Sequence, residues 1–193
     1  MSEQSGWQLA SRSVAEAYEH YIMSAFGYAW NQWLVQLAAP QQGDRLLDVA
    51  CGTGPIARLA APLVGPTGRV VGLDLNAGML DLARSMPVPE GLSVEWREGN
   101  ATALPFDNAS FDIVCCNQGI QILPDRRASL REMVRVLAPV GRLALAVWRG
   151  LEHQPFYSAL AEALERYVGP QVSRKPSGGI HAVPCRRASC THG

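Results

Sequence analysis

Apolar residues in the first half of the chain alternate between short unbroken runs and helical stripes. Arg45–Ala50 and Arg69–Leu73 are short runs rich in Leu and Val with turn residues at their ends, which is the pattern of buried strands. Between the two runs, apolar residues recur at the spacing of one helix face: Ile56, Leu59, Ala60 and Leu63. The stretch therefore predicts a strand, a glycine turn, a helix and a second strand that ends in the carboxylate of Asp74.

The same alternation continues along the chain. Further strands are expected at Leu92–Arg97, Phe111–Cys116 and Arg142–Trp148. Helical stripes fill the intervals at 75–85 and 125–137, and another follows at 155–167. Strands that alternate with helices predict an α/β fold with a parallel sheet and right-handed crossovers. We expect a Rossmann-like sheet in the order 3-2-1-4-5 with helices on both faces.

The N-terminal part, residues 14–39, has a helical pattern and is rich in aromatic side chains. Gly27 is expected to divide this segment into two helices. Two interpretations of the aromatic rings stay open. They either pack against the sheet domain or belong to a lid over a ligand, with Tyr18 or Tyr21 facing the site.

Composition narrows the class of protein. The 193 residues suffice for one domain with a sizeable core, and 48% of them are hydrophobic. Lys plus Arg and Asp plus Glu number 17 each, which argues against a nucleic-acid partner because such domains carry a basic excess. No apolar run approaches the roughly 18 residues of a membrane span. The five cysteines lack metal-binding spacing, so we expect no metal site, reduced thiols and a cytoplasmic protein.

The glycine turn carries the first candidate chemistry. Gly52 and Gly54 allow a sharp turn and the close approach of a ligand to the backbone. The turn leads into a helix N-terminus, where free N–H groups and the helix dipole favour an anionic group. Asp74, at the end of the next strand, can accept hydrogen bonds from both hydroxyls of a ribose. The unit predicts a nucleoside-containing ligand that lies across the strand ends.

Two families of nucleoside binder use such a loop. Gly52-x-Gly54-x-x-Ala57 matches the dinucleotide fingerprint, which leaves an NAD-dependent oxidoreductase as one alternative. Asp48, however, is an acidic residue inside the first strand, where burial is costly unless it makes hydrogen bonds. Asp48-x-Ala50-x-Gly52-x-Gly54 resembles motif I of the class I S-adenosylmethionine-dependent methyltransferases, with Ala50 in place of the usual first glycine. In that family the acidic residue organises the loop and the methionine end of the cofactor, although Asp48 could also be purely structural.

A second run strengthens the resemblance. Leu104–Asp112 resembles the LPF-x-(D/N)-x-SFD signature of the small-molecule branch that includes the ubiquinone and menaquinone methylases. The resemblance covers roughly residues 10–170 and implies S-adenosyl-L-methionine as cofactor and methyl transfer to a small acceptor. At Asn100, relatives have an Asp that contacts the adenine amino group, and an Asn side-chain oxygen can accept the same bond. Together the residues and the resemblance predict cofactor contacts at Asp48, Ala50, Cys51, Gly52, Gly54, Asp74, Leu75, Met79, Asn100, Ala101, Asn117, Gln118 and Tyr21.

The sequence does not identify a catalytic base. His20 and His153 are the candidates by residue type alone. The acceptor stays open, as does methylation at oxygen, nitrogen or carbon. The alternative function is a chain that binds S-adenosylmethionine or S-adenosylhomocysteine without efficient transfer.

The C-terminal part departs from the family pattern. Class I methyltransferases continue past the fifth strand with a helix, a sixth strand and an antiparallel seventh strand that inserts between the fifth and sixth. Residues 173–193 contain no acidic residue, no Leu and no aromatic residue, so we expect the sheet to end at Arg142–Trp148. Such an open apolar edge predicts dimerisation or aggregation. The expected parts are a helical lid at 1–40, a methyltransferase domain at 41–170 and a disordered tail at 171–193, as in a shortened methyltransferase of weak activity.

Overall fold

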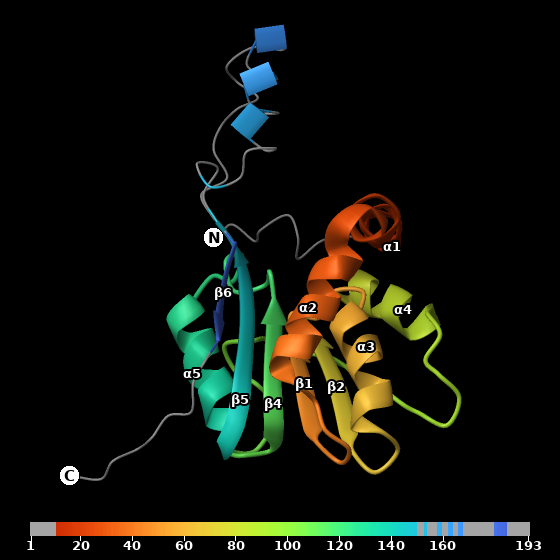
Figure 1. Ribbon diagram of the computed structural model, residues 1–193, viewed down its shortest axis with the longest axis vertical. Coiled ribbons are helices and arrows are strands. Elements are labelled where there is room, and N and C mark those ends of the chain that lie inside the picture. The colour runs from red at the N-terminus through yellow and green to blue at the C-terminus, as the bar shows by residue number, and fades with distance from the viewer. Residues whose placement is uncertain are drawn as a thin grey trace, which may run out of the picture.

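A six-stranded sheet forms the centre of the molecule (Figure 1). The computed structural model describes residues 11–149, 153, 158–159, 162–163, 166–167 and 180–184. The strands are β1 (Arg45–Val49), β2 (Arg69–Asp74), β3 (Glu95–Glu98), β4 (Phe111–Asn117), β5 (Leu137–Trp148) and β6 (Ile180–Pro184). Their order is β3-β2-β1-β4-β5-β6, and the first five are parallel. The predicted parallel order 3-2-1-4-5 is confirmed.

Helices cover both faces of this sheet. They are α1 (Arg12–Ala17), the π-helix η2 (Tyr18–Gly27), α2 (Tyr28–Ala38), α3 (Pro55–Val64), α4 (Ala77–Ser85) and α5 (Arg126–Val136). One buried cluster joins α2 and α3 to the sheet through Leu34, Ile56 and Ile113. A second cluster joins α5 to the opposite face through Met133 and Val114. The sheet therefore separates two cores, as the fold class requires. None of the described helices is both long and apolar enough to cross a membrane.

Gly27 marks a helix boundary at which the backbone keeps helical dihedral angles. It ends η2, and it and Tyr28 both have right-handed helical dihedral angles, so the helix runs on into α2. The predicted boundary at Gly27 is therefore confirmed, although it lies between a π-helix and an α-helix that follow each other directly. A Cβ atom at Gly27 would lie 2.5 Å from Sδ of Met23, so a larger residue here would need the Met23 side chain to move.

β5 is longer than predicted because it absorbs the expected turn. Leu137 lies opposite Phe111, but the next pair is Arg142 with Ile113, so residues 138–141 bulge out of the register. Val140 would be strained in a turn that needs a positive φ angle. It is 94% exposed and is not one of the non-glycine residues with positive φ, so the bulge removes this strain.

The sheet does not end at β5, and this corrects the predicted open edge. β6 pairs antiparallel with β5, from Ala144 opposite Pro184 to Trp148 opposite Ile180 (Figure 1). Our expectation weighed side-chain types, whereas strand pairing uses backbone groups, and an unpaired apolar strand is a template for them. Because β6 occupies this edge of β5, the open edge on which the predicted dimer rested is not present. Of the helix expected at 155–167, the described residues 158–159, 162–163 and 166–167 are helical; the others lie outside the described residues.

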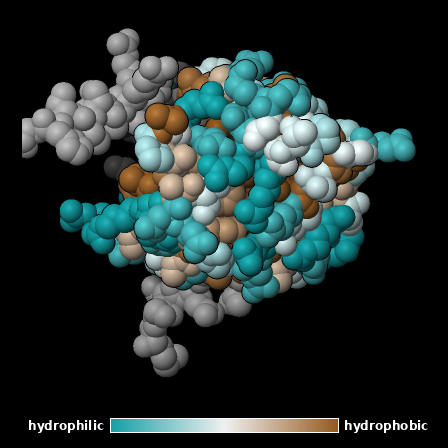
Figure 2. Space-filling model, turned by 90° about the horizontal axis from the view of Figure 1, so that it is seen from below, coloured by the Kyte–Doolittle hydropathy of each residue, from teal (hydrophilic) through white to brown (hydrophobic). Residues whose placement is uncertain are grey.

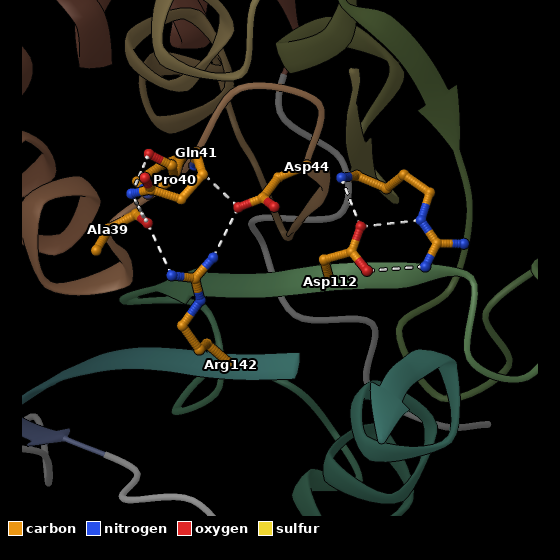
Figure 3. A network of polar contacts seen from close by, with 7 residues as sticks. Ala39, Pro40, Gln41, Asp44, Asp112 and Arg142 are labelled. Carbon is orange, nitrogen blue, oxygen red and sulfur yellow. Dashed lines mark hydrogen bonds and ion pairs between the residues drawn. The ribbon is translucent and has the colours of Figure 1, made fainter. Parts of the chain in front are cut away.

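Polar contacts connect the strands at their amino ends, which form one end of the sheet (Figure 3). Arg142 of β5 donates to the carbonyl of Ala39 at 2.8 Å and to Asp44 at 2.7 Å. Arg45 of β1 donates from Nε and Nη2 to Asp112 of β4 at 2.9 and 2.8 Å and lowers the pKa of that carboxyl. The surface at this end is mainly hydrophilic (Figure 2). This network stabilises the scaffold.

Candidate functional site

A cavity of about 560 Å³ opens at the carboxyl ends of the parallel strands. In parallel α/β sheets this edge is where ligands bind. Residues from the strand ends, the loops that follow them and the helix η2 line it: Tyr18, Ile22, Ala50, Gly52, Leu73, Asp74, Leu75, Asn76, Met79, Gly99, Asn100, Ala101, Thr102, Asn117, Gln118, Gly119, Gln121, Ile122, Leu123, Pro124, Asp125 and Trp148. Most of the wall is apolar, with a few polar groups between.

The two glycines of the loop after β1 have different roles. Gly52, with φ of +56°, lines the cavity, and a Cβ atom there would meet no atom within 4 Å. Gly54 has φ of +78°, but it is absent from the cavity lining, and a Cβ atom there would lie 2.1 Å from the Trp96 ring. The expected approach of a ligand to Gly54 therefore does not match its position. Gly54 makes room for an indole, and Gly52 leaves space open to the cavity.

Asp48 lies beneath this loop and does not line the cavity. It is only 1% exposed, and its Oδ2 atom has no hydrogen-bond partner within the described residues. Burial raises its pKa well above the ordinary value, and the negative charge of Asp74 adds to this. The backbone N–H of Ala57 and the charge of Arg58 oppose the shift. The site thus contains a buried carboxyl that would gain from a nearby positive charge.

Asp74 ties the end of β2 to the loop. Its Oδ2 atom accepts from the backbone N–H of Gly52 at 2.7 Å, and its Oδ1 atom accepts from that of Asn76 at 2.8 Å. Burial raises the pKa of Asp74, and these N–H donors partly oppose the rise. Each carboxylate oxygen has a second acceptor position. Asp74 can therefore hold the loop and still accept hydrogen bonds from a ligand in the cavity.

We expected the side-chain oxygen of Asn100 to accept a hydrogen bond from a ligand, but in the structure this oxygen already has partners. Its Oδ1 atom accepts from both the backbone N–H and the hydroxyl of Thr102, each at 2.9 Å. Because an amide oxygen has two acceptor positions, the side-chain NH₂ is the group left for a ligand. Leu75, Met79 and Ala101 complete an apolar wall on this side of the cavity.

The helix η2 presents Tyr18 to the cavity. Tyr21, the other candidate, is 69% exposed and does not line the cavity. Burial, and then the charges of Glu19 and Asp74, raise the pKa of Tyr18, so its phenol stays protonated. The next residue, Glu19, accepts from the hydroxyls of Thr53 at 2.6 Å and Tyr28 at 2.5 Å. Glu19 thereby fastens η2 to the glycine loop.

The wall at β4 and β5 combines amides with apolar groups. The backbone N–H of Gln118 donates to the carbonyl of Ala146 at 2.7 Å, which holds Gln118 at a positive φ of +56°. Gln121 Oε1 accepts from the backbone N–H of Trp148 at 3.0 Å. Ile122, Leu123 and Trp148 line the cavity beside them. This side therefore has room for an apolar molecule with a polar edge.

The structure brings together most, but not all, of the predicted site residues. Those at the cavity are Ala50, Gly52, Asp74, Leu75, Met79, Asn100, Ala101, Asn117 and Gln118. Asp48, Cys51, Gly54 and Tyr21 do not line it, and neither do the candidate bases His20 and His153. Burial raises the pKa of the Cys51 thiol, so it stays neutral. Sequence reasoning missed Ile22, Thr102, Ile122, Leu123 and Trp148, although Trp148 is the last residue of β5 and strand ends are a usable signal.

Comparisons with known proteins point to one family. Residues 9–174 match the model of the ubiE/COQ5 methyltransferase family. The chain is 34% identical over 147 residues to a 2-phytyl-1,4-naphtoquinone methyltransferase of Synechococcus elongatus, a match that covers 73% of this chain and 61% of the relative. It is 40% identical over 116 residues to the ubiquinone/menaquinone biosynthesis C-methyltransferase UbiE of Hahella chejuensis, which covers 59% of this chain and 47% of that one.

Solved structures share the fold. A SAM-dependent methyltransferase from Aquifex aeolicus has a TM-score of 0.63 at 21% identity, covering 72% of this chain and 74% of that one. The YcgJ protein of Bacillus subtilis has a TM-score of 0.58 at 28% identity, covering 72% and 58%. The chain spans about half to three fifths of the length of the curated relatives it matches. S-adenosylmethionine is the cofactor that family and fold imply, and on the family match this chain belongs to the ubiE/COQ5 methyltransferase family.

Proposed function

We propose that this chain binds S-adenosylmethionine in the cavity and transfers its methyl group to a small-molecule acceptor. The observation that carries the proposal is the link between Asp74 and Gly52. The carboxylate at the end of β2 bonds to the N–H of a glycine that is open to the same cavity. A nucleoside hydroxyl acceptor and a loop with room for a backbone contact are thereby held side by side.

The residues present fit the cofactor. In our proposal Asp74 accepts the ribose hydroxyls, while Leu75, Met79 and Ala101 form an apolar slot for the adenine ring. Ala50 and Gly52 face the methionine end, where the loop leaves space. Asp48 supplies buried negative charge below it, which suits a positively charged sulfur. Cys51 and Gly54 support the loop without contact to the ligand.

Catalysis in this proposal rests on orientation. The bound cofactor supplies a methyl group on a positively charged sulfur, a charge that transfer removes. The chain holds the reacting partners in line and keeps bulk water away. Tyr18 and Ile22 cover the cavity from η2, while Gln118 and Trp148 limit it from the β4–β5 side. The imidazoles of His20 and His153 lie outside the lining, so we assign neither a catalytic role.

For the acceptor we propose a quinone-type ring in its reduced form. By their names, the relatives above are a 2-phytyl-1,4-naphtoquinone methyltransferase and a C-methyltransferase of ubiquinone/menaquinone biosynthesis. The cavity wall offers Ile22, Ile122, Leu123 and Trp148 to an apolar ring, with amides beside them for its oxygens. By analogy with these relatives, we propose that a ring carbon is methylated: the C–CH₃ bond forms as the S–CH₃ bond breaks, S-adenosylhomocysteine is released, and the proton displaced from that carbon passes to solvent after the transfer.

Two measurements test the proposal. Calorimetry with S-adenosylhomocysteine and with NADH compares the two cofactor classes, and we expect binding of the first only. Transfer of a labelled methyl group from S-adenosylmethionine to 1,4-naphthohydroquinone then separates an enzyme from a binding protein. Binding of NADH alone would contradict the proposal, whereas cofactor binding without transfer would leave the alternative of a catalytically impaired chain.

We also propose a cytoplasmic location for the protein and a division of the chain into a lid and a cofactor domain. Cys51, Cys115 and Cys116 are buried free thiols, which agrees with a reducing cytoplasm. The lid at residues 1–40 and the cofactor domain at 41–170 are a division by proposed role, which Tyr18 and Glu19 support because both reach the cavity or its loop.

A further inference from the structure

Two amide side chains connect α2 to the end of β4. Asn117 ends β4 and lines the cavity. Asn31 lies on α2, is only 2% exposed and is outside the cavity lining. Asn117 Nδ2 donates to Asn31 Oδ1 at 2.7 Å, and Asn31 Nδ2 donates to the carbonyl of Gly27, also at 2.7 Å.

The Gly27 carbonyl determines the orientation of both amides. A carbonyl oxygen can only accept, so Asn31 must turn its NH₂ toward Gly27 and its oxygen toward Asn117. That oxygen must in turn meet a donor, so Asn117 presents its own NH₂ to Asn31. The opposite assignment of either amide would place two acceptors or two donors face to face. The Oδ1 atom of Asn117 is therefore directed away from Asn31.

This oxygen is a buried acceptor without a donor. Among the described residues, Asn117 Oδ1 is one of the few buried side-chain atoms that lack a hydrogen-bond partner. Such atoms are rare in folded proteins because an unmade bond in the interior is costly. Asn117 lines the cavity, so a ligand bound there lies next to the side chain that carries this buried oxygen.

Strand register places this acceptor relative to Asp74. Val49 lies opposite Leu73, and Asp48 lies opposite Cys115. Continued by one or two residues, these registers put Asp74, Ala50 and Asn117 in one row across β2, β1 and β4. Neighbouring strands are about 4.8 Å apart, so Asn117 is roughly 10 Å from Asp74 along this row. It lies beyond the proposed ribose position, on the side where the methyl group would be transferred.

We propose that Asn31 is a positioning residue, which holds Asn117 so that its side-chain oxygen accepts a hydrogen bond from an O–H or N–H group of a molecule bound in the cavity. The inference rests on the proposed function for the identity of that molecule. Two donors share this chemistry, namely the ammonium group of the cofactor and a hydroxyl of a reduced quinone-type acceptor. Nothing in the role requires Asn31 to touch either ligand.

Binding measurements on variants test the role and distinguish the two donors. Asn31→Leu should weaken S-adenosylhomocysteine binding by roughly tenfold if the ammonium is the donor, since a hydrogen bond to a charged group is lost. It should instead raise KM for 1,4-naphthohydroquinone, at unchanged S-adenosylhomocysteine affinity, if the hydroxyl is the donor. Gln32→Leu is the matched control, because Gln32 is the exposed neighbour on the same helix. In an Asn117→Leu background, Asn31→Leu should add less than about twofold, because Asn31 acts through Asn117.

A spectroscopic measurement avoids dependence on a variant that folds poorly. The NMR signal of the Asn117 side-chain NH₂, assigned through bonds to its own backbone, should move when S-adenosylhomocysteine or 1,4-naphthohydroquinone is added. Unmoved signals with both probes, or equal effects of Asn31→Leu and Gln32→Leu, would overturn the inference. If the wild-type chain binds neither probe, the proposed function fails and this inference with it; if it binds them and Asn31→Leu changes nothing, only this inference fails.

Discussion

The buried carboxyl of Asp48 predicts that affinity for a positively charged cofactor depends on pH. Its pKa is raised in the folded chain, mainly by burial. The free folded protein therefore binds a proton more tightly than the unfolded chain does. The contribution of Asp48 to stability falls as the pH rises from 3.8, its ordinary value, toward the raised value, and is constant above it. A cationic ligand favours the ionised form and lowers this pKa, so its affinity should increase with pH until Asp48 of the free folded chain is ionised.

The size of the effect follows from the strand geometry. Two residues of extended chain separate Asp48 from Ala50, a distance of about 7 Å. If the sulfonium lies over Ala50, a charge pair at about 7 Å with an effective dielectric constant of about 20 is worth roughly 2.4 kcal/mol, or about 50-fold in affinity. S-adenosylhomocysteine lacks the sulfonium charge but keeps the ammonium and carboxylate, which makes it the matched ligand.

The assay is the ratio of the Kd values of S-adenosylhomocysteine and S-adenosylmethionine, measured by calorimetry between pH 5 and 8. In the wild-type chain this ratio should rise with pH, by up to about 50-fold at the dielectric constant assumed above. Asp48→Asn, which keeps the shape of the side chain, should flatten the rise and unfold at no lower temperature. If the Kd ratio of Asp48→Asn still rises slightly with pH, we assign that rise to Asp74, because burial raises the pKa of Asp74 as well. An unchanged slope in Asp48→Asn, or a flat ratio in the wild type, would refute the reasoning.

Three further predictions concern the loop and the scaffold. Asp74→Ala should weaken S-adenosylhomocysteine binding by roughly 1.5–3 kcal/mol per lost hydrogen bond in calorimetry, while circular dichroism shows an intact fold; unchanged affinity would assign Asp74 to structure alone. Gly52→Val should abolish cofactor binding in a chain that still unfolds cooperatively, whereas Gly54→Val should lower the unfolding temperature through its clash with Trp96; the reverse pattern would contradict the two roles. Arg142→Met should cost roughly 1 kcal/mol in urea unfolding, less at high salt, because Asp44 and the Ala39 carbonyl lose the guanidinium and keep only the donors of Gln41; an unchanged midpoint would show that the network contributes little.

The local unit around the glycine loop could be predicted from sequence because its parts are close together in the chain. The strand before Ala50, the turn and the strand that ends at Asp74 all have short-range signals, and the structure contains each of them. The parallel order of five strands followed from their alternation with helices. The local pattern could not show that Gly52 faces the cavity whereas Gly54 packs against an indole ring. That depends on Trp96, which arrives from another strand.

Two further features could not be predicted, each for its own physical reason: which tyrosine of η2 faces the cavity, and the formation of β6. Tyr18 and Tyr21 are three residues apart, and the choice between them depends on the helical phase. The π-helical hydrogen bonding of η2 changes this phase relative to an ordinary α-helix. The pairing of Asn31 with Asn117 joins residues 86 positions apart, which no local pattern records. β6 forms through backbone pairing to β5, so the side-chain types of this segment do not predict a strand.

The central position of β1 has a consequence for synthesis of the chain on the ribosome. β2 and β3 add to one side of β1, and β4 adds to the other side only later in the sequence. Roughly forty residues separate the end of β2 from the end of β4, which corresponds to about 2–9 s at the usual elongation rate of 5–20 residues per second. During that interval the second edge of β1, with Leu46 and Leu47, has no neighbour from its own chain. If β1 and β2 of this chain pair during synthesis, β1 would be open to other polypeptides on its second edge, and a chaperone that covers this edge would act before β4 is complete.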